Sequence, residues 1–304
     1  MTQKARYKIS IRKKIILAIF LSVFTVMSLT AALGYFWSVG LLRKTIGNDH
    51  LKMAQLFSAA ITRIIDEEVS DLKVYMSHEA RIEEAQNSNL KYKVMSQKEM
   101  KNYFEEKDRR WIADVPDNEF VKSLLSTPVS KRLTSIKNND EGLAEIMIAD
   151  AFGGLVAASG KTSDFYQADE KWWHVAYDKG KGAVFIEGLK VDESSRSLSI
   201  SLAIPVKNSS GEVVGVCKAV LDVKRLFLAL ENFKFGKSGH VALVDSTGDI
   251  LFHPATSSNS EKFLKPQGME ALLRNSQGYK IIDESGIHKY KMLIAWATVE
   301  QPAL

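Results

Sequence analysis

The sequence predicts an α+β protein: an N-terminal transmembrane helix and a long stalk helix, followed by two modules that each contain a five-stranded antiparallel sheet. Three observations support this fold class. A long apolar run lies near the N-terminus, apolar residues with helical spacing follow it, and a strand–turn–strand motif occurs twice in the remainder of the chain. At 304 residues the chain is long enough for one to three domains with substantial cores.

The positive charge of the chain is concentrated at its N-terminus. The formal net charge is +5, but residues 1–14 contain six basic residues and no acidic one. The rest of the chain is therefore nearly neutral, so the basic pI does not indicate a nucleic-acid partner. The six residues are Lys4, Arg6, Lys8, Arg12, Lys13 and Lys14.

Residues 15–42 are predicted to cross a membrane. They contain no charged side chain, and as a helix they would span about 42 Å, more than a hydrocarbon core of roughly 30 Å requires. The basic residues that precede them favour a cytoplasmic segment 1–14 and an extracytoplasmic location for everything after about residue 45. The expected location is therefore the cell membrane, with a single pass. The alternative is a cleaved signal peptide, although the apolar stretch is long for one.

A stalk helix is predicted over residues 45–78, either continuing the transmembrane helix or following a short break at Gly47. Its apolar residues recur every three or four positions, which is typical of an amphipathic helix. Such a helix packs on the domain behind it, on the same helix of a second chain, or on both, so a homodimer is expected. The apolar positions are Leu51, Ala54, Phe57, Ile61, Ile64, Ile65, Val69, Leu72 and Met76.

An internal repeat indicates two copies of one module. Residues 146–157 and 241–252 each contain an apolar strand, an Asp-x-x-Gly turn and a second apolar strand. In each copy the aspartate is expected to cap the turn and the glycine to take a positive φ. The expected modules span 79–234, with a connecting helix at 223–234, and 235–304. Further strands are predicted at 184–186, 198–205, 213–222, 279–283 and 289–297, and short helices at 169–178 and 269–274.

Motifs typical of enzymes or metal sites are not found. The sequence has no Gly-x-Ser-x-Gly elbow, and its six histidines lack a metal-ligand spacing such as His-x3-His. We therefore expect no catalytic activity, no metal and no cofactor. The single cysteine, Cys217, excludes an intrachain disulfide and is expected to be buried.

Three stretches of the sequence resemble the double-Cache extracytoplasmic sensor domains of bacterial and archaeal receptors. They are Thr162–Trp173, Leu202–Val206 and Gly215–Val223. The resemblance extends over nearly the whole chain and implies two PAS-like modules, of which the membrane-distal one, at about 142–222, holds a small ligand. It implies a chemoreceptor or sensor histidine kinase type of protein.

The resemblance also implies a set of ligand-binding residues. The family's amino-acid-binding motif falls on Phe165, Glu170, Trp172 and Trp173, then near Leu189, where its tyrosine is absent, and on Asp222. Its carboxylate-gripping arginine is replaced by Glu170, which repels a carboxylate. We therefore expect a cationic ligand such as an amine. The predicted ligand-binding residues are Phe165, Tyr166, Glu170, Trp172, Trp173 and Asp222, with Tyr177 and Arg196 as weaker candidates.

Purely structural roles compete with several of these assignments. Adjacent helical residues point about 100° apart, so only one of Trp172 and Trp173 is expected to face a ligand. Asp222 could cap the helix that follows it, and Glu170 is favoured by the helix dipole alone.

At the level of the whole protein, the expected function is ligand sensing with signalling across the membrane. The rival hypothesis is a surface-anchored binding or adhesion protein without signalling output. Because the sequence stops at the edge of its last predicted strand, we expect a fragment of a longer receptor. The alternative is a stand-alone sensor that works through a partner.

Overall fold

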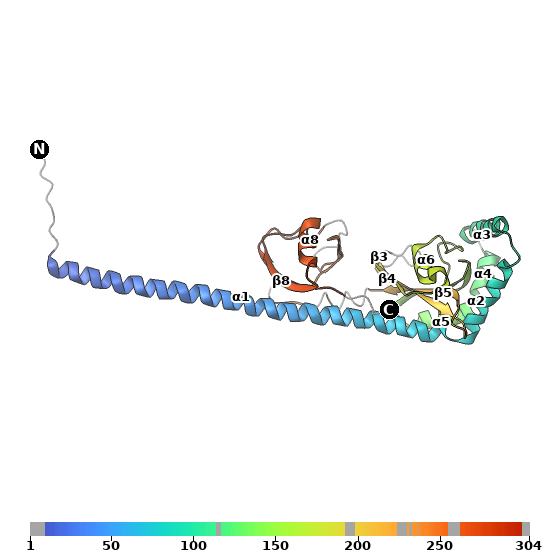
Figure 1. The fold of residues 1–304 in the computed structure, drawn as a ribbon, viewed down its shortest axis with the longest axis horizontal. Coiled ribbons are helices and arrows are strands. Elements are labelled where there is room, and N and C mark those ends of the chain that lie inside the picture. Colours follow the sequence, from blue (N-terminus) through green and yellow to red (C-terminus); the bar gives the residue numbers. More distant parts are fainter. Residues whose placement is uncertain are drawn as a thin grey trace, which may run out of the picture.

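A computed structural model gives the fold and describes residues 10–113, 117–191, 198–223, 230, 233–236, 238–254 and 262–299. One helix, α1 (Ile11–Met76), runs the length of the molecule (Figure 1). A small module containing α8 packs midway along it, and a larger module containing β1–β5 packs at its C-terminal end. Because the larger module lies farther from the apolar N-terminal half of α1, it is the distal module, and the smaller one is the proximal module.

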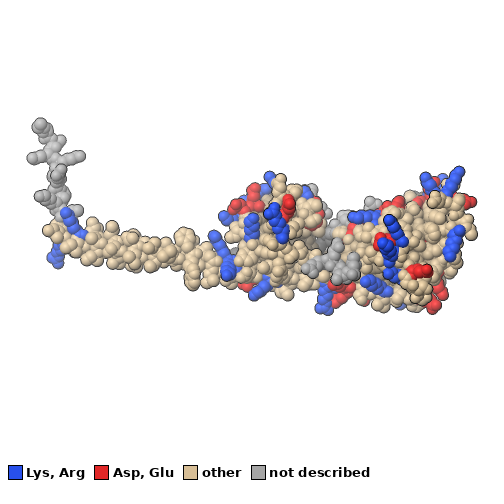
Figure 2. Space-filling view, in the orientation of Figure 1, with Lys and Arg blue, Asp and Glu red and all other residues tan. Residues whose placement is uncertain are grey.

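The N-terminal half of α1 is a candidate membrane span. It is long and apolar enough to cross a bilayer, and the apolar window is not buried by any described part of the chain. Figure 2 shows basic side chains at the N-terminal end of this stretch and then a bare rod without charged side chains. The predicted stalk is the C-terminal half of the same helix, so the structure contains no break at Gly47.

Gly47 leaves space beside α1 that a neighbouring aromatic ring occupies. A Cβ built on this residue would lie 2.4 Å from the ring of Tyr279 in the proximal module. Glycine in a helix interior costs about 1 kcal/mol relative to alanine. In α1 that cost permits an aromatic ring to pack directly against the helix backbone.

Four helices follow α1 and form one end of the distal module. Their starts are fixed by local sequence: Ser96 and Glu99 form a reciprocal capping box, Asn118 caps the next helix, and Thr127 caps a helix that begins with Pro128. The helices are α2 (Glu79–Tyr92), α3 (Gln97–Ile112), α4 (Glu119–Leu125) and α5 (Pro128–Asn139).

The distal sheet has five antiparallel strands in the order β2-β1-β5-β4-β3. The last strand in sequence, β5, lies in the middle and joins the β1–β2 hairpin to the β3–β4 hairpin. The short helix α6 (Lys171–Tyr177), followed by a 3-10 turn at Asp178–Gly180, packs over β3, β4 and β5. The strands are β1 (Leu143–Asp150), β2 (Leu155–Ala158), β3 (Phe185–Val191), β4 (Leu198–Lys207) and β5 (Val213–Asp222).

The two faces of the distal sheet bury different partners. One face packs on the C-terminal part of α1 and on α5, and its core contains Ile148, Leu202 and Cys217. The side chains that α1 packs against this face are spaced three or four residues apart, as the sequence predicts. Full burial of each such side chain stabilises the fold by about 1.5–3 kcal/mol. These side chains are Ile61, Ile65, Val69, Leu72 and Met76.

Both copies of the repeat fold as the predicted capped hairpin. In the distal module Asp150 Oδ1 accepts hydrogen bonds from the backbone N–H groups of Phe152 and Gly154, at 2.9 Å each. In the proximal module Asp245 Oδ1 accepts from Thr247 at 2.8 Å and from Asp249 at 2.9 Å. The turn glycines, Gly153 and Gly248, have φ of 89° and 91°.

The proximal module departs from the predicted five-stranded sheet. Its described residues form two separate two-stranded sheets, β6–β7 and β8–β9, and the helix α8. In the distal module the central strand β5 joins the two hairpins, and no strand among the described proximal residues corresponds to it. The elements are β6 (Leu243–Val244), β7 (Ile250–Phe252), α8 (Pro266–Leu273), β8 (Gln277–Ile282) and β9 (Met292–Ala297).

Candidate functional site

The candidate site lies on the second face of the distal sheet, which α6 covers. Side chains alternate between the faces of a strand, so Val216, Lys218, Val220 and Asp222 of β5 share this face. The loop before α6 crosses the end of the sheet, where Gly154 pairs with Tyr166. The predicted ligand-binding residues therefore surround one face of one sheet, but only some of them point toward it.

Trp172 and Trp173 have different surroundings, as the helical rotation between neighbours predicts. Trp172 faces the sheet, where Lys218 Nζ lies 5.5 Å from the centre of its ring. Trp173 stacks on Tyr177 with ring centres 4.7 Å apart, and its indole N–H donates to the carbonyl oxygen of Asp150 at 3.2 Å. Trp173 thus anchors α6 to the β1–β2 turn, and Trp172 is the one that covers the strands.

Phe165 and Tyr166 belong to an aromatic cluster formed with α3 and α4. The ring of Phe165 lies 5.6 Å from that of Phe120, and the ring of Tyr166 lies 4.5 Å from that of Phe104. The backbone N–H groups of both residues donate to Asp108 Oδ1 at 2.8 Å. Their contacts hold the loop before α6 in place.

Glu170 is exposed and occupies the N-cap position of α6, without a side-chain hydrogen bond to the helix. The sequence predicts Glu170 inside the first turn of this helix, whereas in the structure it immediately precedes that turn. The side chain of Leu189, residue Arg196 and most of the predicted connecting helix at 223–234 lie outside the described residues.

Asp222 ends β5, is half-buried, and pairs with Ser199 of β4. Its backbone N–H donates to the carbonyl oxygen of Gly142 at 2.8 Å. Because β5 rises about 3.3 Å per residue, the Asp222 backbone is about 13 Å from that of Lys218 along the strand. A ligand lying along β5 would contact the ammonium group of Lys218, beside Trp172, at one end and the carboxylate of Asp222 at the other.

Between these two residues the sheet carries buried polar side chains, which are not among the predicted site residues. We call Glu145, Ser199, Ser201, Lys218 and Asp222 the polar strip. Glu145 on β1 and Ser201 on β4 both pair with Val220 of β5, so they flank the central strand at one level. The side chains of Glu145, Ser199 and Ser201 are 6%, 0% and 1% exposed. Within the part of the chain that the structure describes, Ser201 Oγ has no hydrogen-bond partner.

The burial of Ser201 Oγ without a hydrogen-bond partner among the described residues requires a physical reason. A polar group removed from water costs free energy unless it forms hydrogen bonds, and buried polar side chains are therefore normally satisfied. Elsewhere the same face is apolar, with Met147, Ala149 and Ala203 in its core. A row of hydroxyl and carboxyl groups at this position can bind a polar molecule.

The loop that leads into α6 is strongly acidic. Burial, followed by the neighbouring charges of Asp169, Asp108 and Glu170, raises the pKa of Asp164 to about 6. The side-chain amide of Gln167 donates to its carboxylate and opposes that rise. This local negative potential favours cations near the N-terminal end of α6.

The structure also brings together three histidines of the proximal module. His240, His253 and His288 place their ring nitrogens within 4.8 Å of one another. A search for short spacings along the sequence misses them because they belong to three separate segments. The register of the β6–β7 hairpin could have indicated the first two, since they flank its paired strands.

Comparisons with known proteins agree with this architecture. A sequence model of the Cache domain matches residues 42–303. No curated protein matches the chain. The ligand-binding domain of the Pseudomonas aeruginosa amino acid chemoreceptor PctC, solved in complex with GABA, is 14% identical and superposes with a TM-score of 0.51, covering 84% of this chain and 95% of that one. The ligand-binding domain of the Pseudomonas fluorescens chemoreceptor CtaA, solved with L-isoleucine, is 16% identical with a TM-score of 0.44, covering 85% and 94%.

Proposed function

The chain belongs to the Cache domain family, and from this premise we propose that it is an extracytoplasmic sensor that binds a small ligand on the polar strip beneath α6. The ligand class that fits best carries an ammonium group. Asp222 and Glu145 supply carboxylates to it, and Ser199 and Ser201 supply hydroxyl groups. The single observation that carries the proposal is the burial of Glu145, Ser199 and Ser201 on a face whose other core residues are apolar.

Lys218 adds a second recognition element. Its ammonium group lies over the Trp172 ring, where it can pair with a carboxylate at the other end of the ligand. A molecule with both charges would thus lie along β5 with its cation toward Asp222. The complex of the structurally similar PctC domain with GABA, a molecule with both charges, is consistent with this ligand class.

We propose that binding is transmitted through α1. The helix packs on the opposite face of the distal sheet, contacts the proximal module and continues without interruption into the candidate membrane span. A ligand that draws α6 toward the sheet favours one conformation of the distal module, and a displaced sheet displaces α1. We propose binding rather than catalysis as the task of the extracytoplasmic part.

Thermal melting of the full chain in detergent tests the ligand class. The panel contains GABA, diamines, α-amino acids, carboxylates and purines. A ligand at 100 times its Kd stabilises the protein by about 2.7 kcal/mol, which shifts Tm by a few degrees. We expect the shift with compounds that carry an ammonium group; a shift given only by acetate or another small anion would contradict the proposal.

Asp222→Asn separates binding from helix capping at this position. Asparagine caps a helix as well as aspartate does, so the variant should fold, but it lacks the charge that pairs with an ammonium group. We expect the ligand-induced shift to fall by at least half in Asp222→Asn. It should persist in Asp169→Asn, which removes an exposed carboxylate beside α6. Equal shifts in both variants would place the ligand elsewhere.

The rival function, adhesion or ligand capture without signalling, is distinguished by the response of α1. In a receptor, ligand changes the behaviour of the helix on both sides of the proximal module. In a passive binding protein, the change ends at the distal module.

A further inference from the structure

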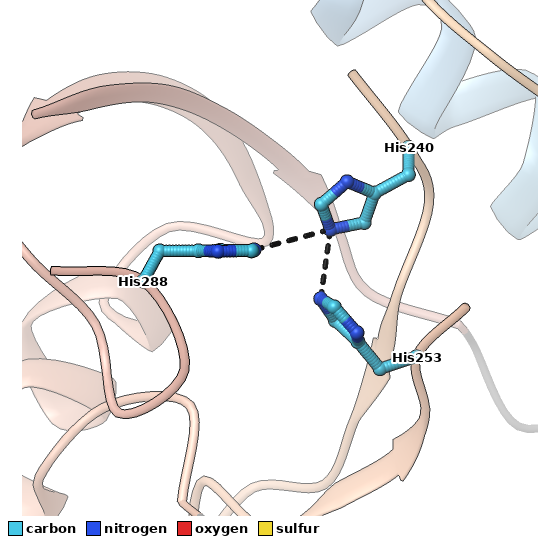
Figure 3. A group of neighbouring side chains, drawn as sticks. All are labelled: His240, His253 and His288. Carbon is cyan, nitrogen blue, oxygen red and sulfur yellow. Dashed lines mark hydrogen bonds between the residues drawn. The ribbon is translucent and has the colours of Figure 1, made fainter. Parts of the chain in front are cut away.

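Three imidazole rings converge in the proximal module, away from the candidate ligand site. Figure 3 shows His240, His253 and His288 pointing toward a common centre. The Nε2 atom of His240 lies 2.8 Å from that of His253 and 3.4 Å from that of His288. His253 is buried, and the other two are half-buried.

Hydrogen bonding on the far side of the rings fixes which nitrogen faces the centre. His240 Nδ1 lies 3.1 Å from the carbonyl oxygen of Ser238, which can only accept, so the proton is on Nδ1 and Nε2 presents a lone pair. His288 Nδ1 lies 3.2 Å from the Tyr290 hydroxyl, which can donate to it or accept from it and so orients the ring. Hydrogen-bond partners on the ring nitrogen that faces away from the metal orient histidines that bind metal ions.

The centre of the cluster is not satisfied by hydrogen bonds among the rings. The single Nε2 lone pair of His240 can accept one N–H, yet two imidazole nitrogens approach it. A cation at the centre would accept a lone pair from all three rings. Nitrogens bound tetrahedrally to Zn²⁺ at about 2.0–2.1 Å are about 3.3 Å apart, which lies between the 2.8 Å from His240 to His253 and the 3.4 Å from His240 to His288.

Burial favours the neutral form of two of the three rings, His253 and His288. Burial, followed by the proximity of His240 and His288, lowers the pKa of His253 to about 4. Burial, followed by the proximity of His240, lowers the pKa of His288. Neutral imidazole is the form that coordinates a metal.

We propose that His240, His253 and His288 form a binding site for a divalent transition-metal ion of the zinc type. Imidazole nitrogens suit Zn²⁺, Cu²⁺ and Ni²⁺, whereas Mg²⁺ and Ca²⁺ prefer oxygen ligands. Three protein ligands leave a fourth position for water or an exchangeable ligand, as in sites where the metal remains accessible.

The position of the site gives the metal a structural effect. His240 and His253 flank the β6–β7 hairpin, and His288 lies in the loop between β8 and β9. In the described residues these hairpins share no strand pairing, so a metal would link them. The segment before His240 also contacts α1, where the ring of Phe235 lies 4.8 Å from that of His50. A bound metal would therefore hold the proximal module together beside the helix that enters the membrane span.

Titration of the full chain with ZnCl₂ tests the proposal. The protein is purified in detergent through a tag without histidine, stripped with a chelator, and titrated calorimetrically. We expect one Zn²⁺ per chain, a Tm raised by several degrees at saturation, and no response to MgCl₂. Absence of saturable binding of one Zn²⁺ per chain would overturn the proposal.

Matched variants locate the bound ion. His288→Gln keeps a polar side chain on a half-buried loop but removes a proposed zinc ligand. Loss of a hydrogen-bond partner of a ligand lowers metal affinity by roughly 10- to 100-fold, so loss of the ligand itself should lower zinc affinity by more than that. Tyr290→Phe, which removes such a partner from an exposed residue, should lower it by about 10-fold or more. The controls are His78→Gln and His174→Gln, exposed histidines outside the cluster that should bind zinc as the unmodified chain does.

Folding and binding are measured separately in these variants. Tm in the presence of chelator reports folding, and Tyr290→Phe provides a test even if a histidine variant unfolds. Unchanged affinity in both folded His288→Gln and Tyr290→Phe, or equal losses in the two control variants, would place the metal elsewhere and overturn the assignment.

Discussion

At the scale of single residues, the candidate site depends on which side chains share the α6 face of the distal sheet. Trp172 covers Lys218 on that face, whereas Trp173 bonds to the turn at Asp150. Asp222 ends the central strand two positions beyond Val220, beside which Ser201 is buried. We therefore expect the ligand to contact the strands rather than Phe165 and Tyr166, whose side chains pack against α3 and α4.

A pH effect is predicted for Asp164. Its pKa is raised to about 6 from an ordinary 3.8, first by burial and then by neighbouring carboxylates. The folded state thus holds a proton that the unfolded chain releases, and the stabilising effect of that proton disappears as pH rises through about 6. Asp164→Asn mimics the protonated form. We expect its Tm to exceed that of the unmodified protein at pH 7.5, with the difference shrinking toward pH 4.5. A difference that is larger at pH 4.5 would contradict this assignment.

A packing effect is predicted for Gly47. Alanine would improve helix propensity by about 1 kcal/mol, but its Cβ would overlap the Tyr279 ring, 2.4 Å away. Overpacking of this kind costs about 1–3 kcal/mol, so we expect Gly47→Ala to loosen the proximal module. The control is Gly40→Ala in the same helix, where nothing lies within 4 Å of the added methyl group. Limited proteolysis of the proximal module should be faster in Gly47→Ala and unchanged in Gly40→Ala.

At the scale of secondary-structure elements, periodicity predicted α1 and the hairpins better than it predicted their connections. Spacings of three and four residues identified the buried face of α1, and the Asp-x-x-Gly turns identified both hairpins. The need for glycine at position 47 depends on Tyr279, more than 200 residues away, which no local pattern reveals. Polar residues of the candidate site were missed for a similar reason: Glu145 and Ser201 flank the same residue, Val220, only because distant strands pair.

The buried face of α1 gives a prediction that compares two identical side chains. Val69 is 5% exposed against the distal sheet, whereas Val74 on the same helix is 69% exposed. Loss of two methyl groups removes about 0.8 kcal/mol each, and the cavity adds to this. We expect Val69→Ala to lower the free energy of unfolding by about 2 kcal/mol and Val74→Ala to change it by less than about 0.5 kcal/mol. Denaturant titration measures both, and equal effects would show that α1 does not stabilise the distal module.

At the scale of the whole molecule, α1 retains an exposed apolar face beyond the candidate span. Leu56 and Ile64 are 63% and 43% exposed and lie on one side of the helix with Ala60. We expect this side to contact the same helix of a second chain. Because Cys217 is fully buried, Ala60→Cys would provide a single accessible thiol. We expect disulfide-linked dimers from Ala60→Cys in membranes and none from Lys101→Cys on α3; equal cross-linking would contradict a dimer through α1.

Three candidate features are distributed along α1. The candidate span is its N-terminal part, the candidate metal site lies in the module beside its middle, and the candidate ligand site lies in the module at its C-terminal end. Both modules contact α1, and the candidate ligand site lies on the opposite face of the sheet that packs on this helix. This arrangement permits a small change in either module to be passed to the same element. The central claim is that ligand binds beneath α6 and that α1 responds.

Hydrogen–deuterium exchange of the full chain, with and without the ligand that gives the largest thermal shift, tests that claim most directly. We expect slower exchange at the amides of α6 (171–177) and of β4 (199–203), together with altered exchange in α1 near residues 61–76. Protection confined to the proximal module would contradict this prediction, because the ligand would then bind elsewhere. Protection of α6 without a change in α1 would contradict it as well, because the protein would then bind its ligand without transmitting a signal through α1.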